Sequence, residues 1–496
     1  SLSCEKKKED LMKAELTLVT RTQQHTCKLA STRPVIFTPD ITCKYYVKHS
    51  HPNSDFVIVI LSLLGGRQIL TSCTEMRPRN NLLVCTRFHS KVFIIITLLF
   101  SAYRACYRAL KLPQRESAAA SWIQTSDCAA PERSVSWDKV TESCKHTVDS
   151  GMTVLVTGSA GFVGYHVSKA LRAQGSRVLG LDNLNDYYPV PLKRARLMEL
   201  EKLGVYTIEA DLNDAHVIRH ALDVCKVTHV LHLAAQAGVR YAVKNPLSYL
   251  HSNIVGTVTL FEEIARTREM PKVVFASSSS VYGLNTEEAP FSEVDDTDSP
   301  ASLYAATKKA DELLAHTYNH IHGMAITALR FFTVYGPFGR PDMAYFSFAN
   351  NIVHGEPVNI FQGPNGSELA RDFTYISDVV NGVIASLETS EPSGKRRDGS
   401  KPHFRVFNLG NKTPVTVSEF VSMLEKHLGK KAKRKYVPMP RTGDVPFTHA
   451  NVSKAALELG YKPITTLDDG LKQFARWYLD FCGAGKCREI QEYKPY

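Results

Sequence analysis

The sequence predicts an α/β protein with a doubly wound parallel sheet and a smaller, mixed C-terminal domain. Three observations support this fold class. Apolar runs of four to six residues recur between residues 152 and 330, stretches of helical periodicity separate them, and the first run leads into a glycine-rich turn. Continuous rather than alternating apolar runs are typical of strands covered on both faces, as in parallel sheets.

The expected strands follow one another along the chain in a regular order. They are "TVLVT" (153–157), "RVLGLD" (177–182), "VYTIEA" (205–210), "HVLHLA" (229–234), "KVVFAS" (272–277) and "AITALR" (325–330). After about residue 331 the regular alternation stops and loops become more frequent. We therefore expect a nucleotide-binding domain at 151–330, a partly interleaved substrate-binding domain at 331–485, and a tail at 486–496.

The first 150 residues differ in composition from the rest. They contain 8 of the 11 cysteines but two of the 28 glycines, and they hold 21 Lys/Arg against 13 Asp/Glu. The remaining 346 residues hold 39 Lys/Arg against 36 Asp/Glu, so most of the formal charge of +11 lies in the N-terminal part. A nearly neutral C-terminal body argues against a nucleic-acid partner. We expect residues 1–150 to be a largely non-globular extension.

An apolar run in this extension, "VFIIITLLFSAY" (92–103), is shorter than the roughly 20 residues that span a bilayer. Snorkelling basic side chains at Arg104, Arg108 and Lys111 would extend it to about residue 112. A membrane anchor at 92–112, followed by a stem, is one interpretation. A buried or poorly ordered segment is the alternative.

Cysteine usage predicts neither a metal site nor a disulfide framework. The cysteines before residue 150 are scattered without zinc-site spacing. The C-terminal body is poor in cysteine, since it has only Cys225, Cys482 and Cys487.

The stretch "VTGSAGFVG" places Gly158, Gly161 and Gly164 between the first strand and the first helix. Glycines at this spacing permit a tight turn, and the helix N-terminus offers free N–H groups to a pyrophosphate. Asp182 ends the second strand, 18 residues after Gly164. A carboxylate there accepts hydrogen bonds from ribose hydroxyls and repels a 2′-phosphate, which favours NAD over NADP. We therefore expect a Rossmann-type NAD site.

Other residues are expected around the same cofactor. Asp211 and Leu212, after the third strand, would flank the adenine, and Ala234 and Ala235 in "LAAQAG" would lie against the cofactor unless they only pack in the core. The remaining expected contacts are Phe162, Val163, Asn253, Tyr304 and Lys308.

The stretch "YAATK" places Tyr304 and Lys308 one helical turn apart on one face. It follows "ASSSSVYG" (276–283) by about 25 residues. A neighbouring ammonium favours the phenolate form of a tyrosine, which can then act as a general base. A serine hydroxyl one strand away can share the substrate's proton.

These motifs carry a family resemblance. From about residue 152 to 480 the chain resembles the extended short-chain dehydrogenase/reductase superfamily and, within it, the plant UDP-glucuronate 4-epimerases. The resemblance implies Tyr304 as the base, Lys308 as its partner and Ser278 as the hydroxyl beside the reacting carbon. The stretches that carry it are "LVTGSAGFVGYHVSKAL", "GLDNLNDYY", "HLAAQAGVRYA", "ASSSSVYGLN", "PASLYAATKKA", "RFFTVYGPFGRPDMAYFSF", "ARDFTYISDVV", "FNLGN" and "GDVPFTHAN".

The resemblance also implies a UDP site. Arg371, Arg441 and Asp444 would hold the nucleotide diphosphate, and we expect Arg240 to join the substrate-binding residues. By analogy with the superfamily the protein is expected to be a homodimer. The resemblance further favours a single-pass Golgi membrane protein of type II with a lumenal catalytic domain, and a cytoplasmic location is the alternative.

Arg340, in "GPFGRPDM" (336–343), needs a different anion if other arginines take the diphosphate. The C6 carboxylate of a hexuronic acid supplies one. Related galactose epimerases have an asparagine in place of Thr333 and no matching arginine. Thr333 and Arg340, with Ser279 and Ser280, are therefore expected to clamp the carboxylate. The alternative is that Arg340 only pairs with Asp342 on a surface turn.

The sequence thus predicts a UDP-glucuronate 4-epimerase that interconverts UDP-glucuronate and UDP-galacturonate through a 4-keto intermediate with bound NAD, and so supplies galacturonate for pectin-type polysaccharides. Decarboxylases and dehydratases of the superfamily carry a carboxylic acid where this chain has Ser280, so they are weaker alternatives. A 4-epimerase of neutral UDP-sugars and a catalytically silent NAD-binding scaffold are the others.

Overall fold

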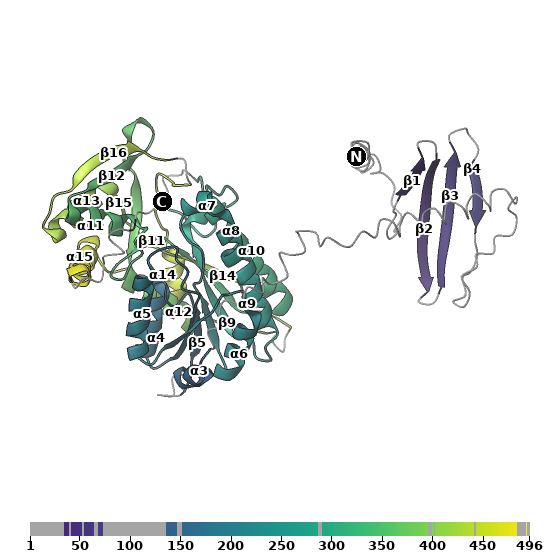
Figure 1. Cartoon of the computed structure of the whole chain (residues 1–496), viewed down its shortest axis with the longest axis horizontal. Coiled ribbons are helices and arrows are strands. Elements are labelled where there is room, and N and C mark those ends of the chain that lie inside the picture. The colour runs from purple at the N-terminus through teal and green to yellow at the C-terminus, as the bar shows by residue number, and fades with distance from the viewer. Residues whose placement is uncertain are drawn as a thin grey trace, which may run out of the picture. The chain divides into compact units, whose positions relative to one another are not determined.

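Figure 1 presents the structure, a computed structural model. The chain divides into two compact units, Ser1–Ala129 and Ala130–Tyr496. The structure describes residues 34–38, 41–51, 54–63, 68–72, 135–145, 151–285, 290–394, 399–400, 402–440, 443–483 and 493.

The first unit contains a four-stranded antiparallel sheet in which each strand pairs with the next one along the chain (Figure 1). The sequence did not predict this sheet, because this part of the chain lacks a sustained strand period. The anchor expected at 92–112 lies outside the described residues. None of the described helices combines the length and the apolarity needed to cross a membrane. The strands are β1 (Pro34–Thr38), β2 (Ile41–His51), β3 (Ser54–Leu63) and β4 (Gln68–Ser72).

The second unit is built on a parallel sheet of seven strands in the order β14-β10-β9-β8-β5-β6-β7. All six strands expected from the apolar runs are present, so the predicted doubly wound fold is confirmed. The strands are β5 (Thr153–Thr157), β6 (Arg177–Asp182), β7 (Tyr206–Glu209), β8 (His229–His232), β9 (Lys272–Ser278), β10 (Ile326–Phe331) and β14 (Arg405–Leu409).

Helices cover both faces of this sheet (Figure 1). On one face lie α4 (Phe162–Ala173), α5 (Val190–Lys202) and α12 (Ile376–Glu388). On the other face lie α3 (Trp137–Ser143), α6 (Ala215–Cys225), α9 (Gly256–Ala265) and α10 (Leu303–His322). Each face buries its own apolar cluster, which explains why the strands read as continuous apolar runs.

Local signals in the sequence fix the ends of these helices. The side chain of Asp214 accepts hydrogen bonds from the backbone N–H groups of His216 and Val217 at the start of α6. The Ser302 side chain caps α10 in the same way. Gly323 ends α10 with a φ of +69°, a conformation that glycine adopts without strain.

A smaller lobe of mixed structure lies beyond the carboxyl end of the sheet (Figure 1). The chain does not stay in this lobe once it has entered it, because α12 and β14 return to the parallel sheet. The rings of Phe373 and Phe420 stack in its core, 4.3 Å apart. The elements of the lobe are β11 (Thr333–Tyr335), β13 (Ala370–Tyr375), β15 (Pro414–Thr416), β12 (Pro357–Gln362), β16 (Lys433–Pro438), α11 (Ala344–His354), α13 (Val417–Leu428) and α15 (Leu467–Gly483).

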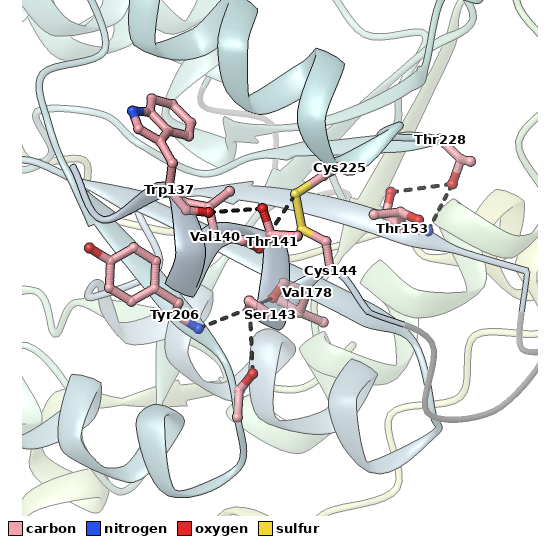
Figure 2. The surroundings of a disulfide bond; sticks show 11 residues. Trp137, Val140, Thr141, Ser143, Cys144, Thr153, Val178, Tyr206, Cys225 and Thr228 are labelled. Atoms are coloured by element: carbon pink, nitrogen blue, oxygen red, sulfur yellow. Dashed lines mark hydrogen bonds between the residues drawn. A yellow bond between two sulfur atoms is a disulfide. The ribbon is translucent and has the colours of Figure 1, made fainter.

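The second unit begins before the boundary expected at residue 150. Helix α3 packs on the sheet, where the Ser143 hydroxyl donates to the Val178 carbonyl (2.6 Å) and accepts from the Tyr206 N–H (3.0 Å) (Figure 2). Cys144, directly after α3, forms a disulfide with Cys225 at the end of α6. The prediction of no disulfide was therefore wrong, because one partner had been assigned to the extension.

The disulfide generates a prediction for stability. It joins residues 81 positions apart, so it restricts the unfolded chain. The double variant Cys144→Ser/Cys225→Ser should lose about 2–4 kcal/mol of unfolding free energy in guanidinium titrations under oxidising conditions. Reduced wild-type protein is the control, since it should match the variant. Equal midpoints for oxidised wild type and variant would contradict a stabilising disulfide.

A buried histidine generates a second prediction. Burial, and then Lys272, lowers the pKa of His229 from 6.5 to about 4. The unfolded chain therefore binds a proton between these values that the folded chain does not, so His229 reduces stability as the pH falls. Wild type should lose about 1–2 kcal/mol relative to His229→Gln between about pH 7 and pH 5. Urea titrations measure this difference, and the exposed His216→Gln is the matched control. A difference that stays constant with pH would refute the prediction.

Candidate active site

A cavity of about 750 Å³ lies at the carboxyl ends of the parallel strands. Its walls come from both lobes: Gly158, Asp182 and Ser278 line it from the sheet, and Phe361 and Arg371 line it from the smaller lobe. Crevices at this edge of a doubly wound sheet are the usual ligand sites of such folds. The volume is within the range of small-molecule and cofactor sites.

The glycine-rich loop forms one wall of the cavity. Gly158 has a φ of +74°, and a Cβ atom there would lie 2.7 Å from the Ala234 nitrogen. A Cβ atom on Gly164 would lie 2.1 Å from the Gly158 oxygen. Only glycine permits this close packing, which leaves Phe162 and Val163 at the start of α4 facing the cavity. The loop and the helix N-terminus can therefore hold a pyrophosphate.

Two carboxylates lie on the same side. Asp182 is buried, and its oxygens accept hydrogen bonds from the N–H groups of Ala160 (3.1 Å) and Leu184 (2.9 Å). It retains acceptor capacity for a ribose. Burial alone would raise the pKa of Asp211, but hydrogen bonds from Asn213 and Asn183 outweigh burial and hold it below its usual value. The other residues expected around the cofactor that line the cavity are Gly161, Leu212, Ala234 and Ala235.

Asn253 does not lie where a cofactor contact was expected. It is fully buried and does not line the cavity. Its amide nitrogen donates to the Gln236 carbonyl (3.1 Å) and the Thr307 hydroxyl (2.9 Å), and its oxygen accepts from the Gln236 N–H (2.8 Å). Asn253 therefore joins the loop after β8 to helix α10, and it supports the cavity from behind.

The expected catalytic side chains line the same cavity. Tyr304 and Lys308 line it from the first turns of α10, and Ser278 lines it from the end of β9. The Ser278 hydroxyl is 3.1 Å from that of Ser280. The Lys308 ammonium donates to the Ala276 carbonyl (3.0 Å), which ties α10 to β9 directly beneath the serines.

Asp311 is a partner of Lys308 that the sequence did not identify. Its carboxylate is 3.1 Å from the Lys308 ammonium, and the two side chains are 1% and 3% exposed. Burial raises the pKa of Asp311 to about 6, against the opposing charge of Lys308. The i,i+3 spacing of the two residues on a helix was the available signal.

Residues expected for the diphosphate and for the rest of the substrate also line the cavity. Arg240 and Asp444 line it and form two hydrogen bonds with each other, at 2.9 and 3.1 Å. Arg371 also lines it and donates to backbone carbonyls, among them that of Pro446 (2.9 Å). Burial lowers the pKa of Arg371 to about 10, although Asp444 opposes this shift. Arg441 lies outside the described residues.

Arg340 lines the cavity, as do Thr333, Ser279 and Ser280. Its guanidinium pairs with Asp342, at 3.0 Å from Nε and 2.5 Å from Nη2. The pairing foreseen in the alternative interpretation is thus present, but the side chain is 21% exposed and belongs to the cavity wall rather than to a surface turn.

Arg196 connects the two halves of the site. It is fully buried, and its guanidinium donates to the carbonyls of Ala160 in the glycine-rich loop (2.7 Å), Phe338 (2.7 Å) and Gly339 (3.1 Å). The turn that presents Arg340 is therefore fixed to the loop that would hold a cofactor.

Several other cavity residues were missed by the sequence. Tyr187 donates to Asp342 (3.1 Å), and the Arg240 guanidinium lies 4.7 Å from the centre of the Phe361 ring. Their contacts bridge distant parts of the chain, so no local pattern reveals them. Lys193, Gln236 and Asn359 also line the cavity.

The site combines a tyrosine–lysine pair and serine hydroxyls with a loop that can hold a dinucleotide. This set of groups suits the reversible oxidation of an alcohol by a bound cofactor, because the tyrosine can take the hydroxyl proton as hydride leaves the carbon.

Comparisons with known proteins agree with this chemistry. The model of the NAD dependent epimerase/dehydratase family matches residues 154–410. The chain is 58% identical to UDP-glucuronate 4-epimerase 1 of Arabidopsis thaliana over 353 residues, which cover 70% of this chain and 82% of that protein. A crystal structure of UDP-glucuronic acid 4-epimerase from Bacillus cereus, in complex with UDP-glucuronic acid and NAD, is 33% identical with a TM-score of 0.60, and the match covers 66% of this chain and 100% of that one.

A more distant relative is named for a different UDP-sugar than the two relatives above. The UDP-glucose 4-epimerase of Thermotoga maritima, solved with UDP-glucose, is 29% identical with a TM-score of 0.58, and the match covers 67% of this chain and 100% of that one. Glycine-rich loop, fold and sequence matches therefore agree, and this chain belongs to the NAD dependent epimerase/dehydratase family.

Proposed function

We propose that this chain is a UDP-glucuronate 4-epimerase, which interconverts UDP-glucuronate and UDP-galacturonate with bound NAD and so supplies galacturonate for pectin-type polysaccharides. The observation that carries the proposal is that Arg340, a cation, lines the same cavity as Thr333 and the catalytic residues. The UDP-glucuronate 4-epimerases among the relatives support the same substrate.

The alternatives lack groups that they would need. At positions 278–280 the cavity wall carries three serine hydroxyls. Dehydratases of the superfamily need a carboxylic acid in place of Ser280, so elimination of water lacks its proton carrier at that position. A neutral sugar has no carboxylate for Arg340 to bind, so the arginine would pair with Asp342 alone. A silent scaffold would not need Tyr304 and Lys308 to line the cavity.

The chain's own residues account for the proton transfers. Tyr304 takes the proton from the O4 hydroxyl, and Ser278 holds that oxygen by a hydrogen bond. Hydrogen bonds to the Ala276 carbonyl and to Asp311 hold the Lys308 ammonium, which lies one helical turn after Tyr304. NAD, when bound, would supply the redox chemistry as the acceptor and donor of the C4 hydride.

The second half of the site controls the sugar. Arg371, which lines the cavity, holds the diphosphate in this proposal while the 4-keto sugar turns about it. The 4-keto uronate is a β-keto acid, which loses CO₂ when the bond to its carboxylate stands perpendicular to the carbonyl plane. Arg340 and Thr333 suppress this loss if they hold the carboxylate in another orientation.

We also propose a lumenal location in the Golgi, with an anchor at 92–112. The Cys144–Cys225 disulfide supports an oxidising compartment. A homodimer formed through α9 and α10 is a further proposal. It is favoured by Leu313 and Ile321, apolar side chains of α10 that are 60% and 59% exposed.

The full-length chain should convert UDP-glucuronate to UDP-galacturonate. The anomeric proton signals in NMR spectra measure this conversion. Tyr304→Phe should reduce turnover by about 10²-fold or more, because it removes the general base. The amount of NAD bound to the variant is the control and should not change. UDP-xylose as the product would indicate a decarboxylase, and no product at all would indicate a scaffold.

Arg340→Ala should raise the KM for UDP-glucuronate by about 10- to 100-fold, since a charge-assisted contact is lost. Inhibition by UDP should stay within about twofold of wild type, because UDP has no uronate. Arg371→Ala is the comparison variant, and it should weaken both the use of UDP-glucuronate and the inhibition by UDP. If Arg340→Ala weakens UDP inhibition as much as UDP-glucuronate use, Arg340 binds the diphosphate, and the proposed carboxylate clamp is contradicted.

A further inference from the structure

The guanidinium assigned to the substrate's carboxylate already holds a carboxylate of the chain itself. Arg340 Nε and Nη2 donate to the two oxygens of Asp342, at 3.0 and 2.5 Å. Two parallel hydrogen bonds are the arrangement that an arginine also makes with a ligand carboxylate. Asp342 is 9% exposed and lines the same cavity, so the pair presents little net charge to a ligand.

Asp342 is held in place by a second partner. The Tyr187 hydroxyl donates to its Oδ2 atom (3.1 Å), and the Tyr187 ring centre lies 5.9 Å from the Arg340 guanidinium carbon. Burial and the charge of Asp342 raise the pKa of Tyr187, so the phenol keeps its proton and remains a donor. The Tyr187 hydroxyl lies against Gly238, where a Cβ atom would be 2.4 Å from it.

We propose that Asp342 is a positioning residue that competes with the substrate's carboxylate for Arg340. The proposal rests on the proposed function, since it requires a uronate. Asp342 keeps Arg340 paired while the sugar turns and its carboxylate is away from the clamp.

Two physical requirements favour this role. A largely buried guanidinium is costly without an anion, so release of the uronate needs a replacement partner. A clamp that holds the uronate too tightly before the turn would lower turnover, because binding energy in the ground state adds to the barrier. A competing carboxylate next to Arg340 meets both requirements.

The test compares Asp342→Asn with wild type in the full-length protein. Calorimetry measures the Kd values of UDP-glucuronate and UDP-glucose, which differ at C6, and their ratio reports the clamp alone. The ratio in favour of UDP-glucuronate should rise about tenfold in Asp342→Asn, and kcat should fall about threefold or more while KM also falls. A merely structural defect would instead raise KM.

A second variant keeps the test decisive. Tyr187→Phe removes a hydrogen bond from Asp342, which then binds Arg340 more strongly, so the ratio should fall about two- to threefold. Asp186→Asn, which removes the exposed charge next to Tyr187 in sequence, is the matched control and should leave the ratio unchanged.

The outcomes separate this inference from the proposed function. No preference of wild type for UDP-glucuronate would refute the proposed function. A wild-type preference that is unchanged or lower in folded Asp342→Asn would overturn the role of Asp342 alone. If Asp342→Asn does not fold, Tyr187→Phe decides, and an unchanged or higher ratio would overturn the inference.

Discussion

The geometry of the site depends on one buried cation. Arg196 donates hydrogen bonds to Ala160 in the glycine-rich loop and to Phe338 and Gly339 in the turn before Arg340. These carbonyls belong to different lobes, and a guanidinium has a rigid, planar set of donors. Arg196 thereby fixes the distance between the cofactor half and the substrate half of the cavity. Hydride transfer depends on such a distance, since small displacements of reacting atoms reduce rates strongly.

A buried polar network supports the serines at the end of β9. The Ser277 hydroxyl donates to Glu312 (2.6 Å), which also binds the buried Arg330 through both of its oxygens. Arg330 in turn contacts Tyr282 (3.0 Å), whose hydroxyl donates to Asn408 on β14 (2.7 Å). Satisfied buried networks of this kind rigidify the elements that they join. The serines above the network are therefore held by β9, α10, β10 and β14 together.

The sequence predicted the features that depend on local pattern. Strands such as β5 and β6 follow from continuous apolar runs, and Gly158 and Tyr304 follow from the short motifs "VTGSAGFVG" and "YAATK". The contacts that it missed join residues far apart in the chain. Arg196 meets Phe338 across 142 positions, and Cys144 meets Cys225 across 81. The expected cofactor contact of Asn253 was wrong for the same reason. Only the fold shows that its side chain binds Gln236 and Thr307 and does not line the cavity.

The return of the chain to the parallel sheet also affects how the protein is made. Strand β14, at the edge of the sheet, follows β11, β12 and β13 of the smaller lobe in the sequence. The ribosome must therefore translate a part of the smaller lobe, from β11 to β13, before the parallel sheet can be completed. Domains that are contiguous in sequence can fold one after the other during synthesis, but these two lobes must mature together.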